Sequence, residues 1–210
     1  MGIFALKSPR PAFFLDRDGV ITENVFYEDT NQWEGPRSMR DFRLLPGVIP
    51  ALQALQDAGY ALILVSNQPN AALGKSLMSQ LGEMHHALRR QMRRNGIRFL
   101  DYCYCLHHPQ SLIPELGGLC RCRKPSPYWL HYAAARYGVD LRASWMAGDR
   151  ETDSLCAARA GVRAIRVGQG MVHDGLATMF APNLPAAVEQ VLRPREIGRE
   201  EWVTGAALHV

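Results

Sequence analysis

Two kinds of apolar pattern alternate along the chain and predict alternating strands and helices. Short unbroken apolar runs precede Asp16 and fill ALILVSNQ at 61–68, which is typical of buried strands. Apolar residues recur at helical intervals in GVIPALQALQDAGY at 47–60 and again from about Lys75 to Asn95, and a glycine marks the expected end of each helix. The first half of the chain therefore predicts a strand, a helix, a strand and a second helix.

The second half of the chain continues this alternation. We expect strands at 97–105, 144–149 and 162–168 and helices at 127–138 and 154–161. Because strands that alternate with helices form parallel sheets, we predict an α/β fold with a doubly wound, mostly parallel, Rossmann-like sheet and helices on both faces. The active crevice of such a fold lies at the carboxyl ends of the strands, where Asp16, Ser66 and Asp149 fall.

The length of 210 residues suits one compact domain. We expect this domain to span 1–192, with a loop rich in Cys, Pro and Gly at 103–124, and we treat 193–210 as a C-terminal extension. Only 58 positions separate Ser66 from Lys124 (124 minus 66), and they already hold a helix, a strand and this loop. The chain therefore has no room for a large cap domain between these residues.

The composition is that of an ordinary globular protein and does not favour disorder or a fibrous architecture. Hydrophobic residues make up 47% of the chain and charged residues 21%. The formal charge of +4 is modest, and we interpret RRQMRR at 89–94 as the solvent face of a helix, so we expect no nucleic-acid partner. No apolar run approaches the roughly 20 residues of a membrane span, and MGIFALKSPRP is too short and interrupted for a signal peptide. We expect a cytoplasmic monomer with no membrane partner.

Paired carboxylates follow the first strand. Asp16 and Asp18 leave the strand end on the same face, and Gly19 frees the backbone to turn. Hydrolysis of a phosphate monoester needs a nucleophile, a cation that offsets oxygen charge and an acid for the leaving group. A carboxylate can be that nucleophile if an ion offsets the repulsion between the two anions, and oxygen ligands favour magnesium. Taken alone, the D-x-D pattern is a weak signal.

Four motifs in order, LDRDGV, SNQ, RKP and GDRETD, resemble the haloacid dehalogenase superfamily of phosphotransferases across roughly residues 12–170. The resemblance implies that Asp16 is the nucleophile and that Asp18 is first the general acid and then the base. It also implies that Ser66 and Lys124 bind the phosphoryl oxygens. Magnesium would be held by Asp16, the backbone carbonyl of Asp18, and Asp149.

Several neighbouring residues are candidates for supporting roles. Asp153, one helical turn beyond Asp149, is expected to orient Lys124 or a metal-bound water. Arg123 offers a bidentate fork for the distal phosphate of a sugar bisphosphate. The other predicted substrate-binding residues are Asn67, Gln68, Tyr27 and Arg150.

A cysteine and histidine cluster precedes the lysine motif. Its members form a C-x-H pair and a C-x-C pair, which are Cys105, His107, Cys120 and Cys122. Thiolates with imidazole favour tetrahedral zinc, and four protein ligands leave no open position, so we expect a structural zinc that pins the loop and holds the following Arg-Lys pair. Cys103 shares a strand face with Cys105 and is assigned to the core, and His108 and Cys156 are assigned structural roles.

The zinc-loop pattern, YCLHHPQS through CRCRKP, is similar to that of the D-glycero-D-manno-heptose 1,7-bisphosphate phosphatases. This resemblance implies removal of the 7-phosphate from a small sugar bisphosphate. Histidinol-phosphate phosphatases carry related Cys and His pairs with a shorter connection, so they and other small sugar-phosphate phosphatases are the alternative. The chain departs from the heptose pattern at Pro69, Asn70 and Leu73 and across 24–41.

Two readings from other classes compete with a phosphatase. In the first, DRD is the metal-binding D-x-D of a nucleotide-sugar glycosyltransferase, which leaves Lys124 and the acids around Asp149 without roles. In the second, the chain is a noncatalytic binding module stabilised by zinc. The intact set of motif residues argues against the second reading, because a relic would have lost one of them.

Overall fold

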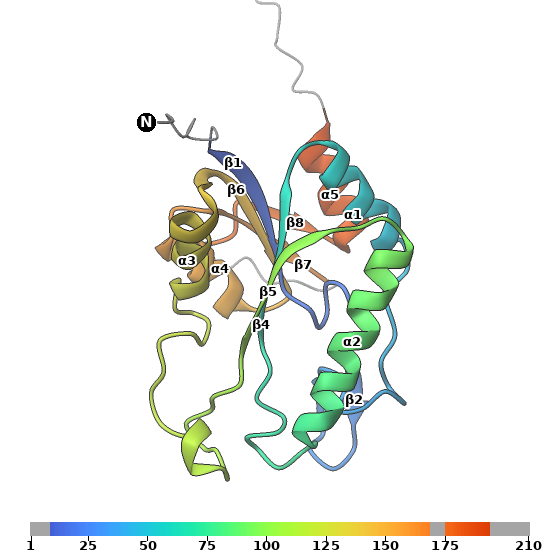
Figure 1. Ribbon diagram of the computed structural model, residues 1–210, viewed down its shortest axis with the longest axis vertical. Coiled ribbons are helices and arrows are strands. Elements are labelled where there is room, and N and C mark those ends of the chain that lie inside the picture. The colour runs from blue at the N-terminus through green and yellow to red at the C-terminus, as the bar shows by residue number, and fades with distance from the viewer. Residues whose placement is uncertain (1–8, 169–174, 194–210) are drawn as a thin grey trace, which may run out of the picture.

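A parallel sheet forms the centre of the protein, and helices flank it on both sides (Figure 1). The computed structural model describes residues 9–168 and 175–193. All pairings within the six-stranded sheet are parallel, in the order β5-β4-β1-β6-β7-β8. The strands are β1 (Arg10–Leu15), β4 (Ala61–Asn67), β5 (Phe99–Cys105), β6 (Val139–Gly148), β7 (Arg163–Val167) and β8 (Met179–Ala181). The predicted fold class is confirmed.

Two apolar layers hold the helices on the sheet. One face carries α1 (Val48–Asp57), α2 (Met78–Arg94) and α5 (Leu184–Leu192), and the other carries α3 (Tyr128–Tyr137) and α4 (Glu151–Arg159). Side chains alternate along β1, so Phe13 and Leu15 pack in the first layer whereas Ala12 and Phe14 pack in the second. Burial on both faces explains why β1 reads as an unbroken apolar run.

Side-chain caps move two helix starts away from the predicted positions. Helix α2 begins at Met78 rather than near Lys75, because the side-chain oxygen of Gln80 accepts a 2.8 Å hydrogen bond from the backbone amide just before the helix. Helix α4 begins at Glu151, ahead of the predicted start, because the Asp153 carboxylate accepts a 3.1 Å hydrogen bond from the amide before that helix. In both cases a local polar contact sets the boundary.

The segment after the acid pair, to which the sequence analysis assigned no elements, contains an antiparallel hairpin. Its strands are β2 (Val25–Tyr27) and β3 (Gln32–Glu34), and the exposed rings of Phe26 and Trp33 lie 5.7 Å apart between centroids. A short 3-10 helix, η1 (Pro114–Leu116), lies in the Cys-rich loop. Strand β8 and helix α5 extend the predicted order. The proposed extension at 193–210 lies outside the described residues apart from position 193.

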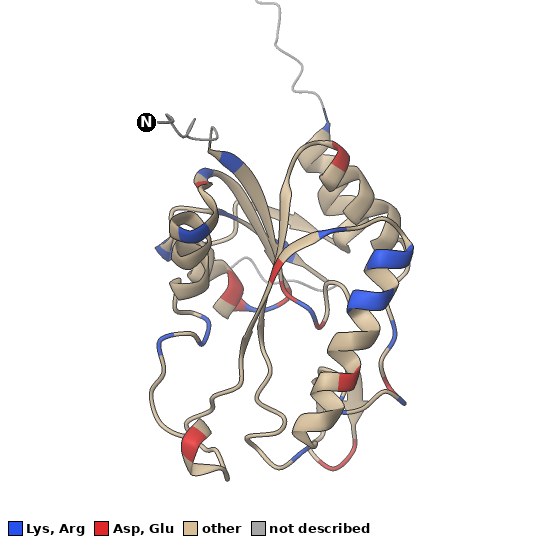
Figure 2. Cartoon of the chain, viewed as in Figure 1, with Lys and Arg blue, Asp and Glu red and all other residues tan. Residues whose placement is uncertain are grey.

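The basic run at 89–94 lies in the C-terminal half of α2, at the end of that helix away from the hairpin (Figure 2). Arg93 and Arg94 occupy the last helical turn, where positive charge complements the helix dipole. This position agrees with the prediction of a solvated helix face. Among the helices of residues 9–168 and 175–193, none has the length and apolarity needed to cross a membrane.

Candidate active site

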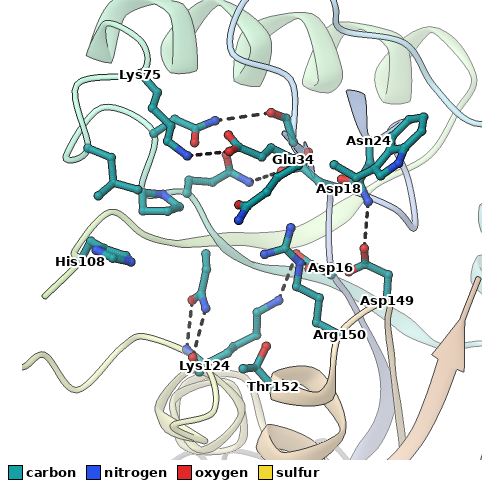
Figure 3. A pocket seen from close by; sticks show the side chains of 18 of the residues that line it. Asp16, Asp18, Asn24, Glu34, Lys75, His108, Lys124, Asp149, Arg150 and Thr152 are labelled. Carbon is teal, nitrogen blue, oxygen red and sulfur yellow. Dashed lines mark hydrogen bonds and ion pairs between the residues drawn. The ribbon is translucent and has the colours of Figure 1, made fainter. Parts of the chain in front are cut away.

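A cavity of about 740 Å³ opens at the carboxyl ends of β1, β4 and β6. Most of the predicted site residues line it, namely Asp16, Asp18, Asn67, Gln68, Arg123, Lys124, Asp149 and Arg150. The β2–β3 hairpin adds Trp33, Glu34 and Gly35 to the wall, and the chain between β4 and α2 adds Lys75. Figure 3 shows Asp16 and Asp149 close together, with the Lys124 side chain directed toward Asp16. The topology therefore gathers segments far apart in sequence at one edge of the sheet.

Lys124 is a buried cation between two acids. Its Nζ lies 3.0 Å from Asp16 Oδ1 and 2.6 Å from Asp153 Oδ1, and it donates a 2.8 Å hydrogen bond to the Val65 carbonyl. Burial alone would lower the pKa of Lys124, but the charges of Asp153 and Asp16 raise it above the ordinary value. The lysine is therefore charged at neutral pH, beside the predicted nucleophile.

Asn67 fixes the backbone that carries this lysine. The Asn67 Nδ2 donates to the Lys124 carbonyl at 3.1 Å, and the Lys124 amide donates to Asn67 Oδ1 at 3.0 Å. Both ends of the Asn67 amide are therefore used by the chain itself. The structure places Asn67 in the pocket wall, but its contacts are those of a support for Lys124.

Three carboxylates lie close together, and two of them, Asp16 and Asp149, line the cavity whereas Asp153 is buried behind it. Asp16, Asp149 and Asp153 each offer an oxygen within 4.8 Å of the others, an arrangement that could hold a metal ion. Burial, followed by the charges of Asp16 and Asp153, raises the pKa of Asp149 to about 7. Asp149 Oδ1 is buried and has no hydrogen-bond partner among the described residues. A divalent cation would offset this repulsion and satisfy the buried oxygen, so the donor set fits magnesium.

Asn24 orients the Asp149 carboxylate from the start of the hairpin segment. Its Nδ2 donates a 2.9 Å hydrogen bond to Asp149 Oδ2. Gly19 permits the close approach of the two chain segments, because a Cβ at this position would overlap Asp149, and its φ of 78° lies in the left-handed region. In the sequence, Asn24 is only a departure from the family pattern, and no local signal marks its contact with a residue 125 positions away.

Asp18 is held as an ion pair. Its two oxygens accept hydrogen bonds from Arg17 Nε at 2.7 Å and Arg17 Nη2 at 3.0 Å, and Gln68 Nε2 donates to Asp18 Oδ2 at 2.7 Å. Burial alone would raise the pKa of Asp18, but the charge and hydrogen bonds of Arg17, together with Gln68 and Thr22, lower it below the ordinary value. In this arrangement Asp18 is the carboxylate form, which can accept a proton.

Ser66 lies beneath the pocket wall instead of lining it. The serine is buried, and its Oγ accepts a 3.0 Å hydrogen bond from Gln68 Nε2. Gln68 is predicted to bind substrate, yet its amide also contacts Asp18 and Arg17. The structure therefore joins the serine motif to the acid pair through Gln68.

Tyr27 is not brought to the cavity, in contrast to its predicted substrate-binding role. Its hydroxyl donates to Asp41 Oδ2 at 2.9 Å and accepts from the Arg37 amide at 2.9 Å, and the Arg37 guanidinium lies 3.9 Å from the ring centroid. These contacts hold the chain after the hairpin. Within the described chain, the cavity is lined by other residues of this segment, such as Asn31 and Trp33.

An ion-pair cluster joins the hairpin to the chain that precedes α2. Lys75 Nζ lies 2.6 Å from Glu34 Oε1, and Arg37 Nη2 lies 3.2 Å from Glu34 Oε2. Burial alone would raise the pKa of Glu34, but its hydrogen bonds, first among them that with Lys75, lower it below 4.5. The buried acid is therefore a carboxylate, and it connects two walls of the cavity. Neither Glu34 nor Lys75 belongs to a motif, so neither could be predicted from the sequence.

The four predicted zinc ligands meet at one point of the Cys-rich loop. Cys105 Sγ lies 3.6 Å from Cys120 Sγ and 3.9 Å from His107 Nδ1, and Cys122 Sγ lies 3.8 Å from Cys120 Sγ and 3.6 Å from His107 Nδ1. Tetrahedral zinc with Zn–S bonds of ~2.3 Å separates its sulfurs by roughly 3.8 Å. The cluster therefore has the spacing and the chemistry of a zinc site.

Two other cysteines pack as expected, whereas His108 lies at the cavity and Arg123 contacts the Cys-rich loop. Cys103 is buried in the core, and Cys156 Sγ donates to the Ser126 carbonyl at 3.2 Å, in a packing position on α4. His108, assigned a structural role from the sequence, lines the cavity. Arg123 Nη1 donates to the carbonyl of His107, a predicted zinc ligand, at 3.1 Å, so the Cys-rich loop and the pocket wall are directly joined.

Known proteins resemble this chain in sequence and in fold. A family model described as HAD-hydrolase-like matches residues 121–192. The D-glycero-beta-D-manno-heptose-1,7-bisphosphate 7-phosphatase of Escherichia coli K12 is 34% identical over 195 residues, which are 89% of this chain and 97% of that relative. The protein of the same name from Vibrio cholerae is 32% identical over 192 residues, with 89% and 99% of the two chains covered.

A solved structure also matches over most of the length. D,D-heptose 1,7-bisphosphate phosphatase from B. bronchiseptica, complexed with magnesium and phosphate, has a TM-score of 0.69 and 28% identity, and the match covers 87% of this chain and 98% of that one. The parallel sheet, the acids at its carboxyl ends and these matches define a haloacid dehalogenase-like hydrolase that acts on phosphoric monoesters. More narrowly, the chain belongs to the family whose members are named heptose-1,7-bisphosphate 7-phosphatases.

Proposed function

We propose that the enzyme removes the 7-phosphate of D-glycero-D-manno-heptose 1,7-bisphosphate through a phosphorylated Asp16. The observation that carries this proposal is the floor of the cavity, where Asp16 Oδ1 lies 3.0 Å from Lys124 Nζ and beside the Asp149 carboxylate. A carboxylate nucleophile with a fixed cation beside it suits attack on phosphorus. The names of the relatives support the heptose substrate.

In the proposed first step, an Asp16 oxygen bonds to phosphorus as the bond from phosphorus to the sugar oxygen breaks. Asp18 must take up a proton before this step, and it gives that proton to the leaving oxygen, while Lys124 and the Ser66 hydroxyl stabilise the phosphoryl oxygens. In the second step, a water molecule gives a proton to Asp18 and attacks phosphorus, which releases inorganic phosphate and restores the Asp16 carboxylate. The same aspartate thus serves as acid and then as base.

Magnesium is the proposed cofactor. Asp16, the backbone carbonyl of Asp18, and Asp149 would hold it. Asn24 supports Asp149 through a hydrogen bond, and Asp153 supports Lys124 through an ion pair. When bound, the ion would offset negative charge on the carboxylates and on the phosphoryl group. A magnesium and phosphate complex of the B. bronchiseptica relative supports this choice of metal.

The cavity wall suits a substrate with a second phosphate. Arg123 and Arg150 line the cavity, and Arg123 is anchored to the zinc loop through His107. We propose that Arg123 binds the distal phosphate with its bidentate guanidinium. Substrate choice is the part of the proposal that the departures at Pro69, Asn70 and Leu73 affect most, since Pro69, Asn70 and Leu73 also line the cavity.

We further propose that Cys105, His107, Cys120 and Cys122 hold a structural zinc ion. All five cysteines are free, and a thiolate site of this kind needs the reduced thiols of a compartment such as the cytoplasm. We also propose that the domain ends near Leu192, because α5 closes the sheet face beside α1 and ends at this residue.

A panel of phosphate esters tests the proposed function. Release of inorganic phosphate with and without magnesium would be measured for heptose 1,7-bisphosphate, fructose 1,6-bisphosphate, histidinol phosphate and 4-nitrophenyl phosphate. We expect magnesium-dependent turnover with the highest kcat/KM for the heptose bisphosphate. A uniform low rate across the panel would refute the heptose assignment, and preference for histidinol phosphate would favour the alternative phosphatase.

A further inference from the structure

We infer that Arg17 and Gln68 are positioning residues that aim the Asp18 carboxylate for proton transfer at the leaving oxygen. The inference rests on the proposed function, in which Asp18 is the acid and base. It assigns a role to Arg17, the residue between the two motif aspartates, and it replaces the predicted substrate-binding role of Gln68. The evidence is a closed ring of hydrogen bonds that these side chains form.

Arg17 grips both oxygens of Asp18 from the protein interior. Its exposed fraction is 0%, and it is not among the residues that line the cavity. The guanidinium donates through Nε to Asp18 Oδ1 at 2.7 Å and through Nη2 to Oδ2 at 3.0 Å. This bidentate geometry fixes the plane of a carboxylate as well as its charge. Arg17 therefore acts on the reaction through Asp18.

Gln68 closes the ring and ties it to the serine motif. Its Oε1 accepts from Arg17 Nη2 at 2.6 Å, and its Nε2 donates to Asp18 Oδ2 at 2.7 Å and to Ser66 Oγ at 3.0 Å. An amide nitrogen has two hydrogens, so both are committed to these neighbours. Gln68, only 3% exposed, thus aligns the proposed acid with the proposed phosphoryl-binding hydroxyl.

One further donor completes the shell around Asp18. Thr22 Oγ1 lies 2.8 Å from Asp18 Oδ1, so each carboxylate oxygen faces two donors. Four donors match the acceptor capacity of a carboxylate and leave it a single orientation. The single hydrogen of the Thr22 hydroxyl can instead go to the Arg17 carbonyl, 3.2 Å away, and this frees one acceptor position on Asp18 Oδ1 for the transferred proton. Gly35 leaves room for Oδ2 on the cavity side, because a Cβ at Gly35 would overlap the Asp18 carboxylate.

Substrates with two kinds of leaving group distinguish a role in positioning Asp18 from a general role in stabilising the fold. A sugar alkoxide must take a proton as its bond to phosphorus breaks, whereas 4-nitrophenolate is a stable anion and leaves without one. The ratio kcat/KM reports events up to departure of the leaving group, so hydrolysis of phosphorylated Asp16 does not affect it. A misaimed Asp18 therefore slows the sugar phosphate selectively, and a damaged fold slows both substrates.

The test measures kcat/KM of Arg17→Lys and Gln68→Leu on 4-nitrophenyl phosphate and on the sugar phosphate that wild type hydrolyses fastest. Lysine keeps the buried cation but loses the fork. We expect kcat/KM for the sugar phosphate to fall about 100-fold, and that for 4-nitrophenyl phosphate to fall less than about threefold. Gln53→Leu is the matched control. Gln53 lies on α1, away from the cavity, and its Nε2 donates to the Asn95 carbonyl at the end of α2. This variant should keep the wild-type kcat/KM on both substrates.

Asp18→Asn supplies the reference pattern, a selective loss on the sugar phosphate. Equal fractional losses on both substrates in folded Arg17→Lys and Gln68→Leu, or no loss in either, would overturn the inference while Asp18→Asn remains selective. If Asp18→Asn itself shows no selectivity, the proposed acid is wrong and the inference falls with it. Circular dichroism and thermal melting establish that each variant is folded.

Discussion

At the residue scale, neighbouring cations fix the position of each acid at the strand ends. Lys124 lies between Asp16 and Asp153, and Arg17 fixes Asp18, so two adjacent acids face two different cations. Asp16 keeps an oxygen beside the cavity and the lysine, whereas Asp18 uses both oxygens within the protein. This difference supports the separate roles of nucleophile and of acid and base.

Asp16→Asn tests the nucleophile directly. The amide cannot form the acyl phosphate, so we expect kcat on the sugar phosphate to fall by about 10⁴-fold or more. The fold should be retained, because the change is isosteric. Steady-state phosphate release measures the loss. Asp57→Asn, the same change on the exposed end of α1, should keep full turnover. Substantial turnover in folded Asp16→Asn would exclude a covalent route through this residue.

Asn24→Ala tests the support of Asp149, the proposed magnesium ligand. Removal of the 2.9 Å hydrogen bond to Asp149 frees that carboxylate to rotate. We expect the magnesium concentration for half-maximal activity to rise about 10-fold, as is typical when a group behind a metal ligand is lost. Asn70→Ala is the control, because Asn70 lines the same cavity and contacts the Gly35 carbonyl instead. An unchanged magnesium requirement in Asn24→Ala would contradict this role.

The acids of the candidate site could be predicted from the sequence, but the residues that contact them could not. Asp16, Asp18 and Asp149 could be predicted because each follows an apolar strand and belongs to an ordered motif. Asn24 has no such mark, since its contact with Asp149 exists only after the hairpin segment folds over the sheet edge. Gln68 was found as a motif residue with a different role, because a motif does not tell which atoms an amide contacts.

At the element scale, the β2–β3 hairpin and the chain before α2 form two walls of the cavity, and Glu34 and Lys75 connect them. We expect Glu34→Gln and Lys75→Met each to raise KM for the sugar phosphate. Each single variant should also lower the free energy of unfolding, and the double variant should lower it little more than either single variant does. The expected coupling between the two residues is about 1 kcal/mol. Urea unfolding of the four proteins in the cycle measures this coupling, and strictly additive effects would contradict a direct connection.

The same ion pair predicts a pH dependence of stability. Because Lys75 and its neighbours lower the pKa of Glu34 below 4.5 in the folded protein, its stabilisation is fully present above pH 4.5 and is lost as the pH falls through the lowered value. The difference in urea midpoint between wild type and Glu34→Gln should therefore shrink in acid. A gap that persists well below pH 4 would show that packing, rather than charge, accounts for the effect.

Elements with strong periodicity were predicted well, and those shaped by local contacts were not. The strands around Phe13 and at 61–67 are buried on both faces, and unbroken apolar runs report this directly. Each strand of the hairpin has only three residues, so a period of two has no length over which to develop. A signal for α5 was present in Asn183, whose side chain accepts a hydrogen bond from the Ala186 amide at 2.9 Å.

At the scale of the whole molecule, the sheet and the Cys-rich loop divide the work of holding the cavity. The sheet buries apolar side chains on both faces and fixes the strand ends that carry Asp16 and Asp149. The loop that carries Arg123 and Lys124 has little regular structure beyond η1. Its position therefore depends on contacts such as the cysteine and histidine cluster and the Asn67 amide.

Cys120→Ser measures how far a zinc ion holds this loop. Loss of one thiolate should abolish tight zinc binding, so metal analysis should show about one zinc per wild-type chain and less than about a tenth of that in the variant. We expect the melting temperature to fall by about 5 °C, which for a chain of this size is a loss of roughly 2 kcal/mol. The KM for a sugar bisphosphate should also rise, because Arg123 is anchored to the His107 carbonyl.

Cys103→Ser is the matched control, because it makes the same chemical change at a buried core position outside the cluster. It should lower stability through the burial of a hydroxyl but keep the zinc. Comparison of the two variants separates loss of metal from loss of packing. A full zinc content in Cys120→Ser would exclude this tetrad, and loss of zinc without a change in KM would show that the loop positions Arg123 by protein contacts alone.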